Sequence, residues 1–204
     1  AIGGNSEVAI GNVVGSNIFN VFAILGLTAL FFPIAVSREN MKFEIPFCIA
    51  VSILLMLLVY NFFVVGEPRL GRWDGAALLL VFTAFMWISL RRGKSSAAAV
   101  GESVEEVNKS LWFAAFSILG GLAALIVSSN FFVDEAVAIA RKLGVSDAFI
   151  SITLLACGTS LPELAASVTA ALKKDTDMAL GNIIGSNIFN ATMILGTASL
   201  ITPL

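Results

Sequence analysis

One acidic residue stands in the middle of an apolar stretch, close to side chains that carry hydroxyl oxygens. Glu163 lies about halfway along the apolar residues 147–170, and Thr159 and Ser160 precede it by four and three positions. In a helix, side chains three and four positions apart lie on the same face. A charge inside a membrane costs about 2.5–3.5 kcal/mol or more, so such a carboxylate normally faces a cavity or a bound cation. The spacing therefore indicates a candidate cation site.

Pro162 is expected to add backbone oxygens to this site. Proline has no N–H, so the carbonyl of Gly158 loses its helical partner and the helix should kink there. A carboxylate, two hydroxyls and freed carbonyls are hard oxygen ligands, which suit Ca²⁺ or Na⁺ rather than Zn²⁺ or copper. The structural alternative is a protonated Glu163 that caps a kinked helix.

A ten-residue motif that occurs twice supplies a second set of oxygen atoms. Residues 11–20 (GNVVGSNIFN) recur as residues 181–190 (GNIIGSNIFN). In each copy three polar residues at positions i, i+4 and i+8 form one stripe: Asn12, Ser16 and Asn20 in the first copy, and Asn182, Ser186 and Asn190 in the second. An amide in lipid needs partners, so hydrogen bonds between helices are the alternative to ion binding. The motif glycines, four residues apart, also fit close helix packing.

The stripe separates expected ligands from expected structural residues. We expect Ser16, Asn20, Ser186 and Asn190 to be ligands because they continue the oxygen-rich face. Asn17 and Asn187 lie off the stripe, and we expect them to be structural.

The two motif copies belong to a longer repeat with an offset of 170 residues. Residues 1–34 and 171–204 are identical at 15 of 34 positions. The second copy lies five predicted spans after the first, and this odd number of steps along successive antiparallel spans places the copies in opposite orientations. Inverted repeats are typical of secondary transporters, whose binding sites lie near the membrane midplane between the repeats.

The composition predicts a membrane protein. Of the 204 residues, 58% are hydrophobic and 13% are charged, whereas a soluble domain carries about 25% charged residues. Six apolar stretches are long enough to cross a bilayer as helices. They are Val8–Pro33, Phe43–Val65, Trp73–Leu90, Leu111–Val133, Asp147–Ala170 and Met178–Pro203. The helical pattern after Val133 suggests that the fourth of them continues as a longer helix. We therefore expect a multi-pass protein of the cell membrane, with the lipid bilayer as a partner.

Several classes of function are disfavoured. The net charge of −2 gives no basic face for nucleic acid. The absence of histidine removes imidazole-based triads and metal sites. No pair of a nucleophile and a base is evident, so we expect neither an enzyme nor a cofactor. Cys48 and Cys157 stand in apolar runs and are expected to be buried thiols.

The connectors suggest an orientation and a division of the chain. Connectors 34–42, 91–110 and 171–177 carry eight basic residues and those on the other side carry four, which predicts that the first set is cytoplasmic. The expected parts are the end of the first repeat (1–34), two spans (35–92), a cytoplasmic linker (93–110), a long helix (111–146) and the second repeat (147–204).

These motifs carry a family resemblance. GTSLPE at residues 158–163, followed by GNIIGSNIFN, resembles the second α-repeat of the prokaryotic-type sodium/calcium exchangers in the cation/calcium antiporter superfamily, and residues 11–20 resemble the second half of the first. The resemblance implies an all-α polytopic membrane protein of ten helices in two inverted halves. The six spans match the third to eighth helices, so we expect the chain to be part of a larger protein, with the missing transmembrane helices as partners. The resemblance also implies that the helix beginning at Leu111 slides across a fixed core of the other helices.

The resemblance implies roles for eight residues. They are Glu163, Thr159, Ser160, Ser186 and Asn190 as cation ligands from the second repeat, Ser16 and Asn20 from the first, and the backbone carbonyl of Ala156 as a sodium contact. The first-repeat glutamate of the family has no position in this sequence. Asn190 stands where the potassium-dependent branch has aspartate, which argues against potassium co-transport.

The leading hypothesis is exchange of Na⁺ for Ca²⁺ at one shared site by alternating access. A proton/calcium antiporter of the same superfamily is the nearer alternative. A cation channel could also present oxygen-lined helix breaks, but the inverted repeat favours a transporter.

Overall fold

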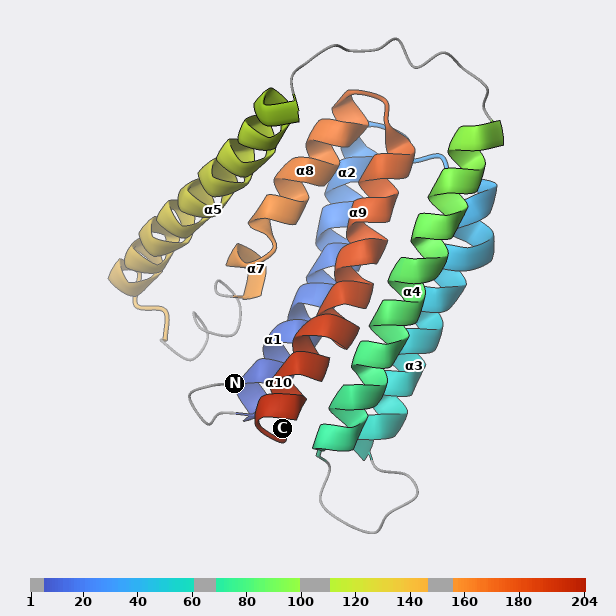
Figure 1. Cartoon of the computed structure of the whole chain (residues 1–204). Coiled ribbons are helices and arrows are strands. Elements are labelled where there is room, and N and C mark those ends of the chain that lie inside the picture. The colour runs from blue at the N-terminus through green and yellow to red at the C-terminus, as the bar shows by residue number, and fades with distance from the viewer. Residues whose placement is uncertain (1–5, 61–68, 100–110, 147–155) are drawn as a thin grey trace.

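The protein is an all-helical bundle in a computed structural model that describes residues 6–60, 69–99, 111–146 and 156–204 (Figure 1). The elements are α1 (Ser6–Phe19), η1 (Asn20–Ile24), α2 (Leu25–Phe31), η2 (Asn40–Glu44), α3 (Ile45–Tyr60), α4 (Arg72–Ala99), α5 (Leu111–Lys142), α7 (Ala156–Gly158), α8 (Leu161–Leu172), α9 (Thr176–Phe189), η4 (Asn190–Ile194) and α10 (Leu195–Ile201). The elements labelled η are single π-helical turns, which occur frequently at functional sites.

The inverted repeat is visible in the helices. The bounds of α1, η1 and α2 become those of α9, η4 and α10 when 170 is added to each residue number. Figure 1 shows the first set running from the lower end of the bundle to the upper end, while the second set returns from top to bottom beside it. The opposite orientation predicted from the number of crossings is therefore confirmed.

Both copies end in the same way because of a proline. Helices α2 and α10 stop at Phe31 and Ile201, and the next residues, Phe32 and Thr202, have extended backbones with φ of −153° and −138°. The residue before a proline is disfavoured in the helical region, and Pro33 and Pro203 follow directly.

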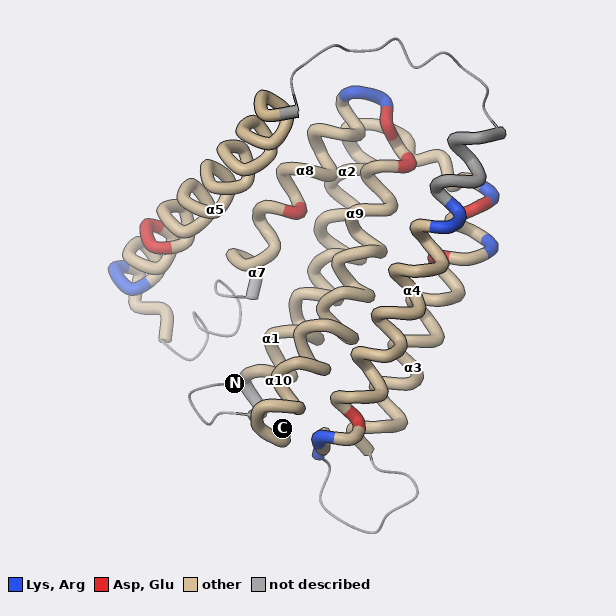
Figure 2. The backbone as a smooth tube through the Cα atoms, in the orientation of Figure 1, with Lys and Arg blue, Asp and Glu red and all other residues tan. Residues whose placement is uncertain are grey.

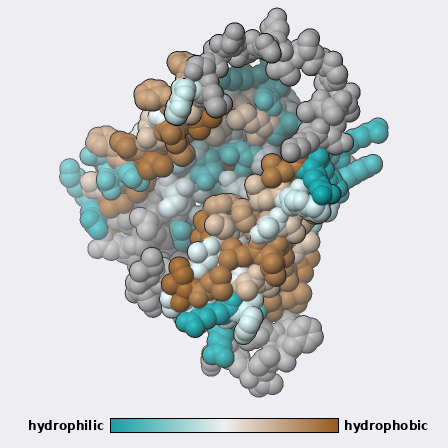
Figure 3. Space-filling model, viewed as in Figure 1, coloured by the Kyte–Doolittle hydropathy of each residue, from teal (hydrophilic) through white to brown (hydrophobic). Residues whose placement is uncertain are grey.

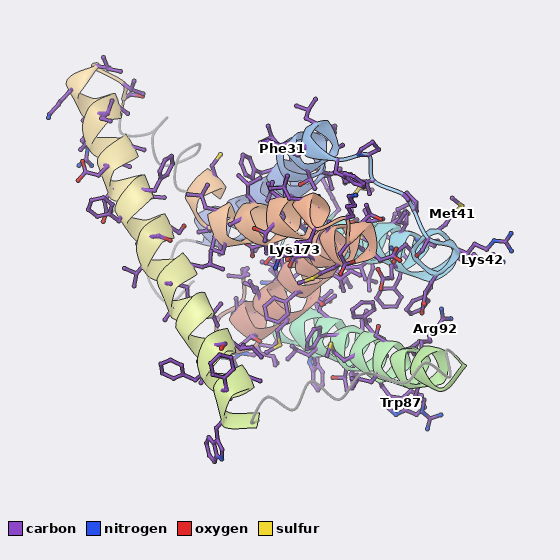
Figure 4. The ribbon with its side chains drawn as sticks, turned by 90° about the horizontal axis from the view of Figure 1, so that it is seen from above. Phe31, Met41, Lys42, Trp87, Arg92 and Lys173 are labelled. Atoms are coloured by element: carbon purple, nitrogen blue, oxygen red, sulfur yellow. The ribbon has the colours of Figure 1, made fainter. Side chains whose placement is uncertain are left out.

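Within the described part of the chain, five helical segments are long and apolar enough to cross a membrane: Ala9–Phe31, Asn40–Tyr60, Arg72–Arg92, Trp112–Lys142 and Thr176–Ile201. Apolar side chains are exposed along them, and Figure 3 shows this apolar surface on the visible face. In the view from above, Phe31, Met41 and Trp87 point away from the bundle, and their exposed fractions are 60%, 61% and 56% (Figure 4). The protein is thus a multi-pass membrane protein whose outer surface suits lipid.

The predicted span Asp147–Ala170 is not one continuous helix. Its described part consists of the short α7 and the 12-residue α8, separated by a turn at residues 159–160, and residues 147–155 lie outside the described part. Pro162 falls in the first turn of α8, where a missing N–H costs nothing. The proline therefore starts a new helix instead of kinking an existing one.

Two other helices are longer than their predicted spans. Helix α5 continues to Lys142, as the pattern after Val133 suggested. Helix α4 continues to Ala99, inside the stretch 93–110 that was predicted to be a linker. Residues 93–99 (GKSSAAA) contain no proline, and three of the seven are alanines, which favour a helix.

The charged residues gather near the ends of the helices, apart from an acidic position on α8 (Figure 2). The described basic residues of the predicted cytoplasmic connectors lie at the upper end of the bundle, and those of the other connectors lie towards the opposite end. This arrangement fits the predicted grouping of the connectors, while the assignment of one side to the cytoplasm stays a prediction.

Helices α4 and α10 cross closely because glycines meet at the crossing. A Cβ atom on Gly75 would collide with Ser199 Oγ and lie 2.7 Å from the carbonyl oxygen of Gly196. Around this crossing lies an apolar core whose buried members include Val51, Leu78 and Leu195.

Replacing Gly75 with alanine should destabilise the bundle by about 1–3 kcal/mol, because the added methyl group meets backbone that cannot move away. The free energy of unfolding can be measured in mixed micelles by titration with a denaturing detergent. Gly120→Ala on α5 is the matched control, because a Cβ atom there would meet nothing within 4 Å beyond the neighbouring backbone of its own helix. Alanine should leave the stability unchanged or raise it there. Equal losses in both variants would contradict close packing at Gly75.

Candidate cation-binding site

The turn between α7 and α8 is stabilised from a neighbouring helix. Ser129 Oγ on α5 donates a hydrogen bond of 2.9 Å to the backbone carbonyl of Gly158. This carbonyl is the one that Pro162 was predicted to free for a cation. Val133, one turn further along α5, packs against Gly158 so closely that a Cβ atom there would collide with its Cγ2. Ser129 was not predicted from the sequence, because nothing there distinguishes it from the other two serines of α5.

Glu163 lies in the first turn of α8 and is half-buried. Its Oε2 atom is buried and has no hydrogen-bond partner among the described residues. Its backbone carbonyl accepts a hydrogen bond of 3.2 Å from Asn182 Nδ2, which also donates to Ser167 Oγ at 2.9 Å. Asn182, the first residue of the second stripe, therefore joins α9 to α8.

A pocket of about 360 Å³ opens beside Glu163. It is lined by Glu163, Gly181, Asn182, Gly185, Ser186, Phe189 and Asn190. Three of the predicted ligands, Glu163, Ser186 and Asn190, thus line one cavity. The motif glycines Gly181 and Gly185 form part of its wall, so the absence of their side chains also leaves room for a bound ion.

The remaining predicted ligands have other surroundings. Ser16 Oγ lies 3.3 Å from Thr159 Oγ1, which joins the two repeats. Ser160 is buried at the start of α8, and Ala156 is the first residue of α7. Thr159 lines a different pocket, of about 520 Å³, between α5 and the turn. The turn at residues 159–160 interrupts the helical face that Thr159 and Glu163 were expected to share.

Four asparagines join the two repeats at the crossing of α1 and α9. Asn17 Nδ2 donates to the backbone carbonyl of Asn187 at 3.1 Å, and Asn187 Nδ2 donates to that of Asn17 at 3.4 Å. Asn20 Nδ2 donates to Asn187 Oδ1 at 2.9 Å, and Asn190 Nδ2 donates to Asn17 Oδ1 at 3.0 Å. Each bond has its counterpart under the offset of 170. This agrees with the expectation that Asn17 and Asn187 are structural.

The oxygen atoms of this region suit a hard cation. Among the described residues, no three or more Asp, Glu, Cys or His side chains are grouped so that they could hold a metal ion. The pocket instead offers one carboxylate together with hydroxyl and amide groups. Asn20 Oδ1 is buried and, within the described ranges, has no hydrogen-bond partner. Oxygen ligands of this kind are those that Ca²⁺ prefers.

Comparisons with known proteins agree with this picture. A sequence profile of the family described as "Sodium/calcium exchanger protein" matches residues 1–91 and 113–204. The chain is 41% identical to the putative antiporter CaxA of Alkalimonas amylolytica over 98% of its own length and 62% of that protein. It is 32% identical to the sodium/calcium exchanger MaX1 of Methanosarcina acetivorans over 98% of its own length and 66% of that protein.

A solved structure is also similar. The sodium-calcium exchanger NCX_Mj superposes with a TM-score of 0.77 and 33% sequence identity, over 97% of this chain and 62% of that one. The chain thus spans about three fifths of the length of the solved exchanger and of CaxA.

Replacing Ser129 with alanine should lower the free energy of unfolding by about 1 kcal/mol, because the buried carbonyl of Gly158 loses its donor from α5. Ser128→Ala is the matched control, since Ser128 is exposed and its hydroxyl bonds only to the carbonyl of Leu125 in the same helix. The detergent titration described above measures both variants. A loss of the same size in the control, or no loss in either, would show that Ser129 does not stabilise the turn.

Proposed function

Because the chain belongs to the sodium/calcium exchanger protein family, we propose that the full-length protein exchanges Na⁺ for Ca²⁺ across its membrane by alternating access. The family is one of transporters, and we propose that the protein catalyses no chemical reaction and needs no cofactor beyond the transported ions. The identities to CaxA, named a putative antiporter, and to MaX1, named a sodium/calcium exchanger, support this proposal.

One observation carries the proposal: Glu163 lines a pocket together with polar residues, and its Oε2 atom is buried without a hydrogen-bond partner among the described residues. An ionised carboxylate in such a place needs a positive charge or strong donors. Ser186 and Asn190 line the same pocket and bring oxygen atoms, so a cation satisfies the carboxylate and the neutral ligands together. We propose these three residues as ligands, with Ser16, Asn20, Thr159, Ser160 and the carbonyl of Ala156 around the same crossing of the repeats.

Exchange follows if Ca²⁺ and Na⁺ compete for the same carboxylate. In the full-length protein, Glu163 and the first-repeat glutamate expected from the family would together balance the charge of one Ca²⁺ or of the Na⁺ ions that replace it. An empty site would keep an uncompensated charge that resists crossing the membrane. Helix α5 is suited to alternate the access, because it packs mainly against α7 and α8 and exposes most of its side chains. Movement of α5 would break the hydrogen bond from Ser129 to the backbone carbonyl of Gly158. Gly158 directly precedes Thr159, one of the proposed ligands.

An outward sodium gradient should drive calcium uptake into vesicles that contain the full-length protein. Isotopic calcium flux measures the uptake, and vesicles without a gradient give the background. Uptake driven only by a pH gradient would show that the counter-ion is H⁺ and not Na⁺. Single-channel current steps without any counter-ion requirement would indicate a channel instead.

Glu163→Gln should reduce sodium-driven calcium uptake to the level of empty vesicles, because a neutral amide cannot balance the charge of a divalent cation. Glu135→Gln is the matched control, since Glu135 is exposed on α5 and lines neither the pocket beside Glu163 nor the one beside Thr159. This control should keep the uptake of the unmodified protein. Normal transport by the Glu163 variant would show that Glu163 is not a ligand of the transported cation.

A further inference from the structure

The hydrogen bonds between the repeats fix the orientation of the amides of Asn20 and Asn190. A backbone carbonyl can only accept hydrogen bonds. The carbonyls of Asn187 and Asn17 therefore require the NH₂ groups of Asn17 and Asn187, respectively, on their side. This leaves Asn17 Oδ1 and Asn187 Oδ1 as acceptors on the other side of each amide.

These two acceptors in turn orient the next two amides. Asn17 Oδ1 faces Asn190 and Asn187 Oδ1 faces Asn20, at 3.0 and 2.9 Å. Only an NH₂ group can make a hydrogen bond to them. The amide groups of Asn190 and Asn20 are thus turned with their nitrogen atoms towards the opposite repeat. Their oxygen atoms point the other way, and Asn20 Oδ1 is left buried without a partner among the described residues.

We propose that Asn17 and Asn187 are positioning residues that make the amides of Asn190 and Asn20 present oxygen, and not NH₂, to the transported cation. The two ends of an amide have opposite polarity, so a rotation of 180° would replace a cation ligand with a repelling donor. This inference rests on the proposed function, because it assumes that a cation occupies the pocket lined by Asn190.

The orientation is set across the repeats and not within them. Asn17 on α1 holds Asn190 from the second repeat, and Asn187 on α9 holds Asn20 from the first. Removal of Asn17 should therefore act through Asn190, although Asn20 is closer in sequence and lies three positions away. A residue that only tied the two helices together would show no such preference.

Asn17→Leu should lower the Ca²⁺ affinity of the purified full-length protein about tenfold, which corresponds to about 1.4 kcal/mol. The leucine removes the acceptor, so the amide of Asn190 is free to turn. Isothermal titration calorimetry with CaCl₂ in sodium-free buffer measures the affinity. Asn40→Leu is the matched control: Asn40 is also a buried asparagine whose amide reaches another segment, at Asp177, but it belongs to a separate cluster. It should keep the affinity, even if its stability falls.

A double-mutant cycle separates positioning from simple stabilisation. Adding Asn17→Leu to Asn190→Ala should change the affinity little further, because the amide that Asn17 orients is already absent. Adding Asn17→Leu to Asn20→Ala should multiply the two losses, because no hydrogen bond joins these residues. Independent effects in the first pair, or a lower unfolding midpoint of Asn17→Leu with unchanged affinity, would overturn the proposal. The symmetric variant Asn187→Leu, which acts through Asn20, serves if Asn17→Leu does not fold.

A measurement on the unmodified protein distinguishes this inference from the proposed function. Side-chain NMR of ¹⁵N,¹³C-asparagine should show slow exchange of the NH₂ protons of Asn20 and Asn190, both without and with CaCl₂, and added Ca²⁺ should shift only their Cγ signals. Fast exchange of these NH₂ protons would overturn the inference. Protected NH₂ groups without any binding of Ca²⁺ would instead count against the proposed function.

Discussion

A polar group inside a bilayer has to find its partner within the protein, and this constraint explains most of the architecture. The break before α8 leaves the carbonyl of Gly158 without a helical donor, and Ser129 from another helix supplies one. Four asparagines in the apolar motif helices satisfy one another across the repeats. Three buried side-chain oxygen atoms have no hydrogen-bond partner among the described residues: Oε2 of Glu163, Oδ1 of Asn20 and Oγ of Ser89. The first two belong to predicted ligands, and unpartnered oxygen atoms of this kind are those that an ion can use.

The inverted repeat satisfies the buried amides of both copies with equivalent residues. Each hydrogen bond between the asparagines has an equivalent under the offset of 170, so the same type of contact serves both repeats. Asn182 extends the network beyond the motif helices, because it bonds to Ser167 and to the backbone carbonyl of Glu163 on α8. The structure therefore joins the crossing of the two motif helices to a helix that packs beside it.

Much of this arrangement could be predicted from the sequence, because it depends on periodicity and repetition. The apolar runs predicted five of the spans, and the offset of 170 predicted the antiparallel pair of motif helices. The polar stripe of the second copy predicted three residues of the pocket beside Glu163. The sequence predicted a kink where the structure has a turn at residues 159–160. A proline kinks a helix only when it lies in the helix interior, and the sequence does not show that a new helix begins at Leu161, directly before Pro162. Ser129 could not be identified, since its partner is a backbone carbonyl 29 residues away and no local pattern records such a contact. The roles of the predicted ligands stay predictions.

The π-helical turns carry information about the history of the chain. A turn of this kind is an irregularity that a regular helix does not need, and η1 and η4 begin at equivalent asparagines and end at equivalent isoleucines. Two independent origins at the same position of both repeats would be a coincidence. The simplest explanation is that the ancestral unit already contained this turn before it was duplicated and inverted. The widened turn beginning at the asparagine is then older than the two-fold arrangement of the repeats.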